Sequence, residues 1–298
     1  MKDGNERTVF ESYPAVAVAI VTFPTEDNGR LMMLQRAFAS VESQASHGFT
    51  DFEVYIIDDG SPLQDQVFEV AKAWGTDMFD KYGVTVGFKG LDKNTGGQGY
   101  GFNWVMMMAQ ASLVAYLDDD DEWDPNYLAT MVPHLIGPGT DFVYARWRVD
   151  TNEPCPDGYK SYIVDEDSGI AEMPWQEHTG HALTQRGAMR NFISPVFSVH
   201  SVGAAVMQCL YPTGSLWNDM IQRFNDYEFF SRWERQGCRF TGVNEVLGQV
   251  HFHGANITTR PMDVDVADIN KGKLVKGVEA WHDVRQSCSD LVQAVSTN

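Results

Sequence analysis

The chain is short of cysteine, of long hydrophobic runs and of positive charge, and each shortage excludes a class of protein. Its four cysteines stand far apart, which excludes a CxxC zinc site and a dense disulfide framework. The longest clean apolar run, residues 15–21, is far shorter than the ~20 residues that span a bilayer. The first ten residues are charged and lack the apolar segment of a signal peptide. We therefore expect a soluble, reduced, cytoplasmic protein.

Basic residues are half as frequent as acidic ones: 22 Lys and Arg against 41 Asp and Glu, a net charge of −19. Such a surface repels phosphate backbones and anionic membranes. Residues 178–260 are an exception, with seven Arg, five acidic residues and five of the eight His. The charge of this segment is therefore compatible with an anionic binding partner. The length of 298 residues allows one large domain or two small ones.

Alternating apolar segments predict an α/β fold. Residues 15–22, AVAVAIVT, are apolar on both faces, which is typical of a parallel strand covered by helices on both sides. A turn, FPTEDNGR, and an amphipathic helix over 31–46 follow. The pattern continues with strand 52–58, helix 65–74, strand 84–88, helix 102–111 and strand 113–117. This order predicts a parallel sheet with right-handed crossovers.

The second half of the chain is less regular. After a strand at 142–147, residues 150–215 are rich in Gly, Pro, His and Trp, and no linker marks a separate domain. We expect this half to share the same sheet. A helix over 219–236 and a last strand at 250–253 complete the expected elements.

Acidic side chains gather where the predicted strands end. Ligands of parallel sheets bind beyond the carboxyl ends of the strands. Four adjacent carboxylates, Asp118 to Asp121, follow the fourth strand and repel one another, so a nearby Mg²⁺ or Mn²⁺ would relieve the repulsion. The alternative is a solvated acidic loop. EF-hand spacing, the GxGxxG dinucleotide fingerprint and a P-loop lysine are all missing.

Six segments carry a resemblance to a known family: AVAVAIVTF, YIIDDGSP, NTGGQGYGFN, AYLDDDDEWDP, NDYEFFSRWERQG and VHFHGANIT. In this order, over residues 15 to about 258, they resemble the family 2 glycosyltransferases of the GT-A type. The resemblance implies one GT-A catalytic domain over 1–260, with a Rossmann-like, mostly parallel sheet flanked by helices. Within it, about 10–125 would bind the nucleotide sugar and about 140–258 the acceptor. Residues 261–298 would form a C-terminal tail with helical stretches.

The same resemblance assigns nucleotide-binding residues. It implies that Thr22, Asp58 or Asp59, and Asn94 line the base and the ribose, and that Asp118 faces the ribose. An Asp at this strand end accepts a hydrogen bond from a base N–H, and uracil offers one. This favours a UDP-sugar, with dTDP-sugars next.

The resemblance also implies a metal site for Mn²⁺ or Mg²⁺. If residues 118–120 are the family's Asp-x-Asp motif, Asp120 is the metal ligand; residues 119–121 are an alternative register. His253, or with less support His251, would complete the metal or diphosphate site.

Asp226 is the implied catalytic base, because Asp226, Arg232 and Gly237 keep the family's spacing. The alternative for Asp226 is a helix-capping role. Two departures stand out. Asn225 replaces the usual Glu before this Asp, and Phe102 replaces an Arg that many members have. A diphosphate contact would then come from elsewhere, with Lys93 and Arg260 as the candidates.

These observations predict a metal-dependent, inverting glycosyltransferase that moves a sugar from a nucleotide diphosphate sugar to an acceptor hydroxyl. A sugar-nucleotide pyrophosphorylase and a non-catalytic sugar-nucleotide-binding module are the alternatives. The acceptor stays open between a glycan, a lipid-linked sugar, a protein and a hydroxymethylated base in nucleic acid. The net charge of −19 argues against the last of these.

Overall fold

The structure is a computed structural model that describes residues 14–136, 142–150, 163–165, 170–172, 192–195, 217, 229 and 240–253. Its helices and strands are β1 (Val16–Thr22), α1 (Arg30–Ser46), β2 (Phe52–Asp58), α2 (Gln64–Tyr82), β3 (Val86–Gly90), α3 (Gln98–Met108), β4 (Leu113–Asp118), β5 (Glu122–Trp123), α4 (Tyr127–Met131), α5 (Pro133–Ile136), β6 (Phe142–Asp150), β7 (Ile163–Asp165), β8 (Ile170–Glu172), β9 (Phe192–Pro195) and β10 (Phe240–Val250). Among the described helices, none combines the length and apolar character needed to cross a membrane.

The described strands form one 10-stranded sheet, in the order β3-β2-β1-β4-β9-β6-β10-β5, with β7 and β8 off this path. The first four strands pair in parallel, as expected. Strand β9 runs antiparallel to both β4 and β6 and so joins the two halves of the sheet. The described part of the second half therefore continues the same sheet, and the predicted α/β fold is confirmed.

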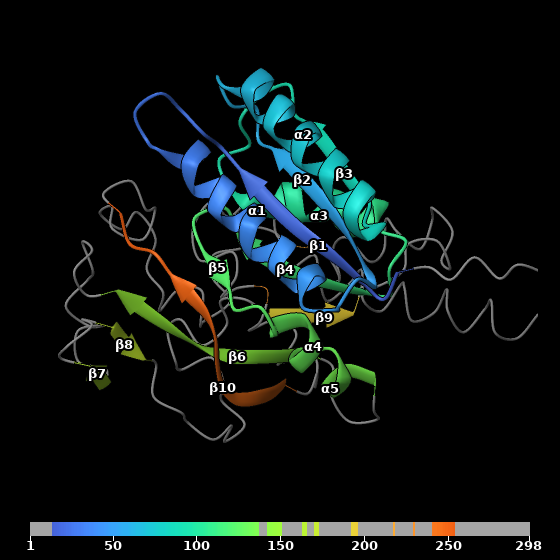
Figure 1. Cartoon of the computed structure of the whole chain (residues 1–298). Helices are drawn as coiled ribbons and strands as arrows, with labels where there is room; N and C mark the ends of the chain where they lie inside the picture. The colour runs from blue at the N-terminus through green and yellow to red at the C-terminus, as the bar shows by residue number, and fades with distance from the viewer. Residues whose placement is uncertain are drawn as a thin grey trace, which may run out of the picture.

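Strand β1 lies at the centre of two hydrophobic cores. Its side chains alternate: Val16, Val18 and Ile20 pack into the core that includes residues of α1 and α2. The alternate β1 residues pack into the core that includes residues of α3. Figure 1 shows β1 as a blue strand of the sheet, with α1 and α2 on the near side. Burial on both faces explains why this segment is apolar throughout.

Helix α3 begins earlier than the sequence predicts. It starts at Gln98, inside the glycine-rich segment, and not at residue 102. Gly101 makes this possible, because a Cβ there would lie 2.7 Å from Cγ2 of Val21 in β1. The glycines therefore let the helix approach the strand closely, and this brings Gln98 to the end of β4.

Other boundaries also differ from the prediction. Strand β3 covers residues 86–90 in place of 84–88, and β6 continues to residue 150. Helix α2 continues to Tyr82 and ends at Gly83, which has a left-handed φ of 72°. Strand β10 ends at Val250, where the predicted last strand begins, so His251 and His253 lie just beyond its end. The predicted helix over 219–236, apart from residue 229, and the tail over 261–298 lie outside the described residues.

Candidate active site

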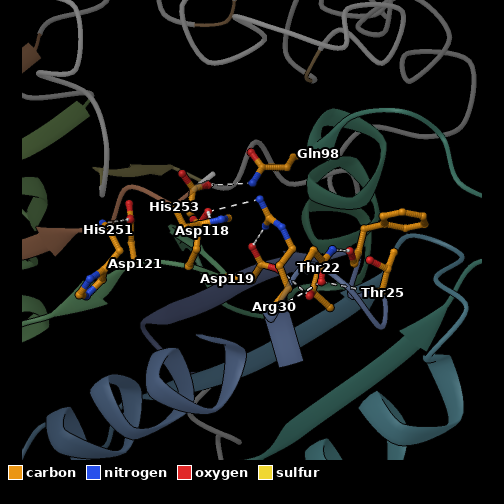
Figure 2. A network of polar contacts seen from close by, with 12 residues as sticks. Thr22, Thr25, Arg30, Gln98, Asp118, Asp119, Asp121, His251 and His253 are labelled. Atoms are coloured by element: carbon orange, nitrogen blue, oxygen red, sulfur yellow. Dashed lines mark hydrogen bonds and ion pairs between the residues drawn. The ribbon is translucent and has the colours of Figure 1, made fainter. Parts of the chain in front are cut away.

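Three carboxylates of the acidic run converge beyond the end of β4. Asp118 is the last residue of the strand, and the backbone N–H of Asp121 donates to its carbonyl at 3.1 Å, which closes a turn. One oxygen from each of Asp118, Asp120 and Asp121 lies within 4.8 Å of the others. Figure 2 labels Asp118 and Asp121 of this group, together with nearby polar contacts. This convergence favours the register in which Asp118 and Asp120 form the Asp-x-Asp pair.

Asp119 lies between Asp118 and Asp120 in the sequence and is buried. Its side chain is 0% exposed and accepts a hydrogen bond of 2.5 Å from the hydroxyl of Thr22. Its other oxygen is ion-paired with Arg30. Burial raises the pKa of Asp119 to about 6, although the charge of Arg30 opposes this rise. Thr22, which was predicted to line the nucleotide, thus has its hydroxyl bonded to Asp119.

Arg30 is a site residue that the sequence reading missed, because residues 23–30 were read as a turn. Its guanidinium contacts Asp119 and lies 3.3 Å from Oδ2 of Asp120. These carboxylates raise the pKa of Arg30, with Asp119 as the largest cause. A signal existed: Arg30 opens α1, whose first turn has no acidic residue. A cation is unfavourable at the positive end of a helix unless something nearby compensates it.

The structure distinguishes the two candidate histidines. Nε2 of His253 lies 2.9 Å from Oδ2 of Asp120, beside the converging carboxylates. His251 instead places Nε2 at 2.8 Å from Oε1 of Glu122, and this contact lowers the pKa of Glu122. The backbone N–H of His251 donates to Asp121 at 3.1 Å. The geometry favours His253 as the histidine at the metal or diphosphate site.

Asp58 lies at the end of β2, as predicted, and its side chain contacts the turn that follows. It is fully buried, and its two oxygens accept hydrogen bonds of 2.7 and 2.6 Å from the backbone N–H and the hydroxyl of Ser61. An aspartate that bonds its own backbone a few residues on shapes a turn. In this structure Asp58 therefore stabilises the turn after β2, which leaves Asp59 as the better candidate for the nucleotide.

Asp59 and Asn94 lie together, as the predicted nucleotide site requires. Asp59 accepts hydrogen bonds from Asn94 at 3.1 Å and from the N–H and hydroxyl of Thr95 at 3.0 and 2.8 Å. Burial raises the pKa of Asp59. Gln98, four residues after Asn94, donates to Oδ1 of Asp118 at 2.9 Å. The loop from 94 to 98 thus connects the predicted nucleotide end of the site to the acidic run.

The donor set suits a hard divalent cation. Carboxylate oxygens with an imidazole nitrogen are acceptable ligands for Mn²⁺, and carboxylates alone suit Mg²⁺. The fit rests on Asp118, Asp120 and Asp121, whose oxygens converge, and on His253, which contacts Asp120.

The structure does not describe every predicted residue. Asp226, the predicted base, and Arg260 lie outside the described residues. Lys93 is exposed, and Phe102 is buried in the core, where its ring lies 5.0 Å from that of Tyr116.

Comparison with known proteins identifies relatives from bacteria and archaea. The chain is 37% identical to poly(ribitol-phosphate) β-N-acetylglucosaminyltransferase TarP of Staphylococcus aureus over 130 residues, which are 44% of this chain and 36% of TarP. The chain therefore spans about a third of the length of this relative.

Solved structures share the fold. TarS 1–349 of S. aureus in complex with UDP-GlcNAc superposes with a TM-score of 0.57 and 13% identity, covering 87% of this chain and 70% of TarS 1–349. The mannosyltransferase PcManGT of Pyrobaculum calidifontis, in complex with GDP-Man and Mn²⁺, gives a TM-score of 0.53 and 15% identity, covering 82% and 59%. These likenesses show the GT-A fold.

The family model described as glycosyl transferase family 2 matches residues 21–192. This span is more than half of the chain and includes Thr22, Arg30 and the acidic run. The chain therefore belongs to glycosyl transferase family 2.

Proposed function

We propose that the protein is a divalent-metal-dependent, inverting glycosyltransferase that moves a sugar from a UDP-sugar to an acceptor hydroxyl. The observation that carries this proposal is the convergence of Asp118, Asp120 and Asp121 within 4.8 Å, with His253 in contact with Asp120. These groups lie beyond the carboxyl end of β4, beside β1, which is where parallel sheets bind nucleotides.

The reaction has two chemical demands. The acceptor oxygen forms a bond to the anomeric carbon while the bond from that carbon to the diphosphate oxygen breaks, and UDP leaves. A divalent ion held by Asp118, Asp120 and Asp121, with His253, would stabilise the charge of the departing diphosphate as a Lewis acid. The proton of the acceptor hydroxyl passes to a carboxylate base, for which we propose Asp226. One direct displacement inverts the anomeric carbon.

The relatives support the choice of donor. TarS structures hold UDP and UDP-GlcNAc, and the 37%-identical relative is named as a poly(ribitol-phosphate) N-acetylglucosaminyltransferase. PcManGT holds GDP-Man, so a GDP-sugar is the competing donor. We propose UDP-GlcNAc as the first donor and a polyol phosphate as the first acceptor to test, followed by glycan, lipid-linked, protein and hydroxymethylated-base acceptors.

A donor and acceptor screen with purified protein tests the proposal. We expect UDP release and a glycosylated product when a UDP-sugar, an acceptor and Mn²⁺ are all present, and the loss of both in excess EDTA. The anomeric configuration of the product, read by NMR, should be inverted. UTP formation from UDP-sugar and pyrophosphate would instead indicate a pyrophosphorylase. Binding without any turnover across the screen would indicate a binding module.

A further inference from the structure

Arg30 occupies an unusual place between two carboxylates of the acidic run. Its side chain is 15% exposed and contacts Asp119, which is 0% exposed, and Asp120, which is 7% exposed. A buried carboxylate without a compensating partner is costly, and the hydroxyl of Thr22 alone is a neutral donor. Arg30 therefore places a positive charge directly against the buried carboxylate of Asp119.

The position of Arg30 is itself fixed by the loop before α1. Oδ1 of Asn28 accepts hydrogen bonds from the backbone N–H groups of Thr25 and Arg30, at 2.9 and 3.1 Å. The side-chain amide of Asn28 donates to the carbonyl of Phe23 at 3.0 Å. The loop thus holds the first residue of α1 at the end of β1, next to the end of β4. Figure 2 shows Arg30 reaching from this point toward the acidic run.

Arg30 also limits how the carboxylate of Asp120 is oriented. Oδ2 of Asp120 lies 3.3 Å from Nη2 of Arg30 and 2.9 Å from Nε2 of His253. Two donors from distant parts of the chain therefore meet on one carboxylate oxygen. A rigid, planar guanidinium anchored on Asp119 is well suited to fix a second carboxylate beside it.

We propose that Arg30 is a positioning residue for the divalent-cation site: anchored on buried Asp119, it holds Asp120 in the orientation in which Asp118, Asp120 and Asp121 bind a metal ion. This inference rests on the proposed function only in requiring that the site binds a divalent ion. Partners of metal ligands act in this way, and their removal typically lowers metal affinity about 10- to 100-fold.

The test measures Mn²⁺ binding to the protein alone, by EPR titration, so that it does not depend on turnover. We expect Arg30→Met to weaken Mn²⁺ binding about 10- to 100-fold. Arg30→Lys keeps the charge but cannot span both carboxylates, so its affinity should fall between Arg30→Met and the wild type. Arg36→Met is the matched control, because Arg36 lies on the same helix, has a half-exposed side chain and carries the same charge.

A double variant tests the anchor on Asp119. If Asp119 acts by anchoring Arg30, Asp119→Asn should lower Mn²⁺ affinity in the wild-type background and lower it little further in the Arg30→Met background. Equal losses in both backgrounds would overturn the anchoring role. Thermal unfolding of each variant shows whether the fold survives, and Arg30→Lys carries the test if Arg30→Met does not fold.

The outcomes separate this inference from the proposed function. If the wild type binds Mn²⁺ and Arg30→Met binds it equally well, the positioning role is overturned and the proposed function stands. If Arg30→Met binds Mn²⁺ normally but UDP more weakly, Arg30 contacts the diphosphate directly, and the positioning role is again overturned. A wild-type protein that binds neither Mn²⁺ nor UDP would overturn both.

Discussion

Nε2 of His253 lies 2.9 Å from Oδ2 of Asp120, although 133 residues separate the two in the sequence. The candidate site is therefore assembled from the segment after β4 and the segment after β10.

Asp120→Asn should abolish the divalent dependence of UDP binding and lower the affinity for Mn²⁺ with UDP at least about 100-fold. A lost ligand should cost no less than a lost partner of a ligand, for which 100-fold is the upper end. Calorimetry of UDP with Mn²⁺, and separately with EDTA, measures this effect. Asp77→Asn is the matched control, since Asp77 is exposed on α2. Equal UDP binding by wild-type protein in EDTA and in Mn²⁺ would rule out the metal site.

His253→Ala and His251→Ala should differ in what they change. His253 contacts Asp120, so His253→Ala should weaken Mn²⁺ binding about 10-fold or more with little change in thermal stability. His251 is buried against Glu122, so His251→Ala should lower the melting temperature and affect Mn²⁺ binding less. EPR titration and thermal unfolding of both variants provide the comparison. The reverse pattern would assign His251 to the metal.

Asp226→Asn should keep the fold and donor binding while slowing sugar transfer by about 10²- to 10⁴-fold, the usual contribution of a general base. Asparagine keeps the shape of the side chain and still caps a helix, but it cannot take the acceptor's proton. Product formation and UDP affinity are measured on the same preparation. Wild-type turnover, or unfolding with no separable catalytic defect, would return Asp226 to the capping role.

Gly60→Ala should destabilise the protein more than Gly83→Ala, by about 1–3 kcal/mol. The two glycines have nearly equal φ values, 69° and 72°, so the cost of the left-handed backbone is shared. Only at Gly60 would the new Cβ collide with backbone, 2.3 Å from the carbonyl carbon of Lys93. Denaturant unfolding of both variants gives the difference. Equal losses would show that the turn and the loop at 93–95 separate freely.

The central strands were predictable because their buried residues form short, continuous apolar runs in the sequence. Strand β2 has the predicted bounds, and β1 and β4 differ from the prediction by one residue, since runs of apolar residues end abruptly in polar ones. The start of α3 was not predictable, because it depends on the close approach of Gly101 to Val21, a contact between distant segments.

The sequence predicted the carboxylates of the site but not its positively charged residue, Arg30. Four adjacent aspartates after a buried strand are a local signal. The contact of Arg30 with Asp119 joins residues 89 apart, and nothing in FPTEDNGR marks it except a cation at the start of a helix. The choice between His251 and His253 likewise depends on which imidazole reaches Asp120, which the chain's spacing alone does not decide.

The pairing of β5 with β10 has a consequence for how the protein folds during synthesis. The two residues of β5 directly follow the acidic run, and their antiparallel partners, Gly248 and Gln249, lie in the last described strand. A nascent chain therefore carries the aspartates long before the strand that completes their surroundings leaves the ribosome. Closing so long a loop is slow and entropically costly. A cation that binds only the closed form would act as a latch, adding about 2.7 kcal/mol at 100 times its dissociation constant.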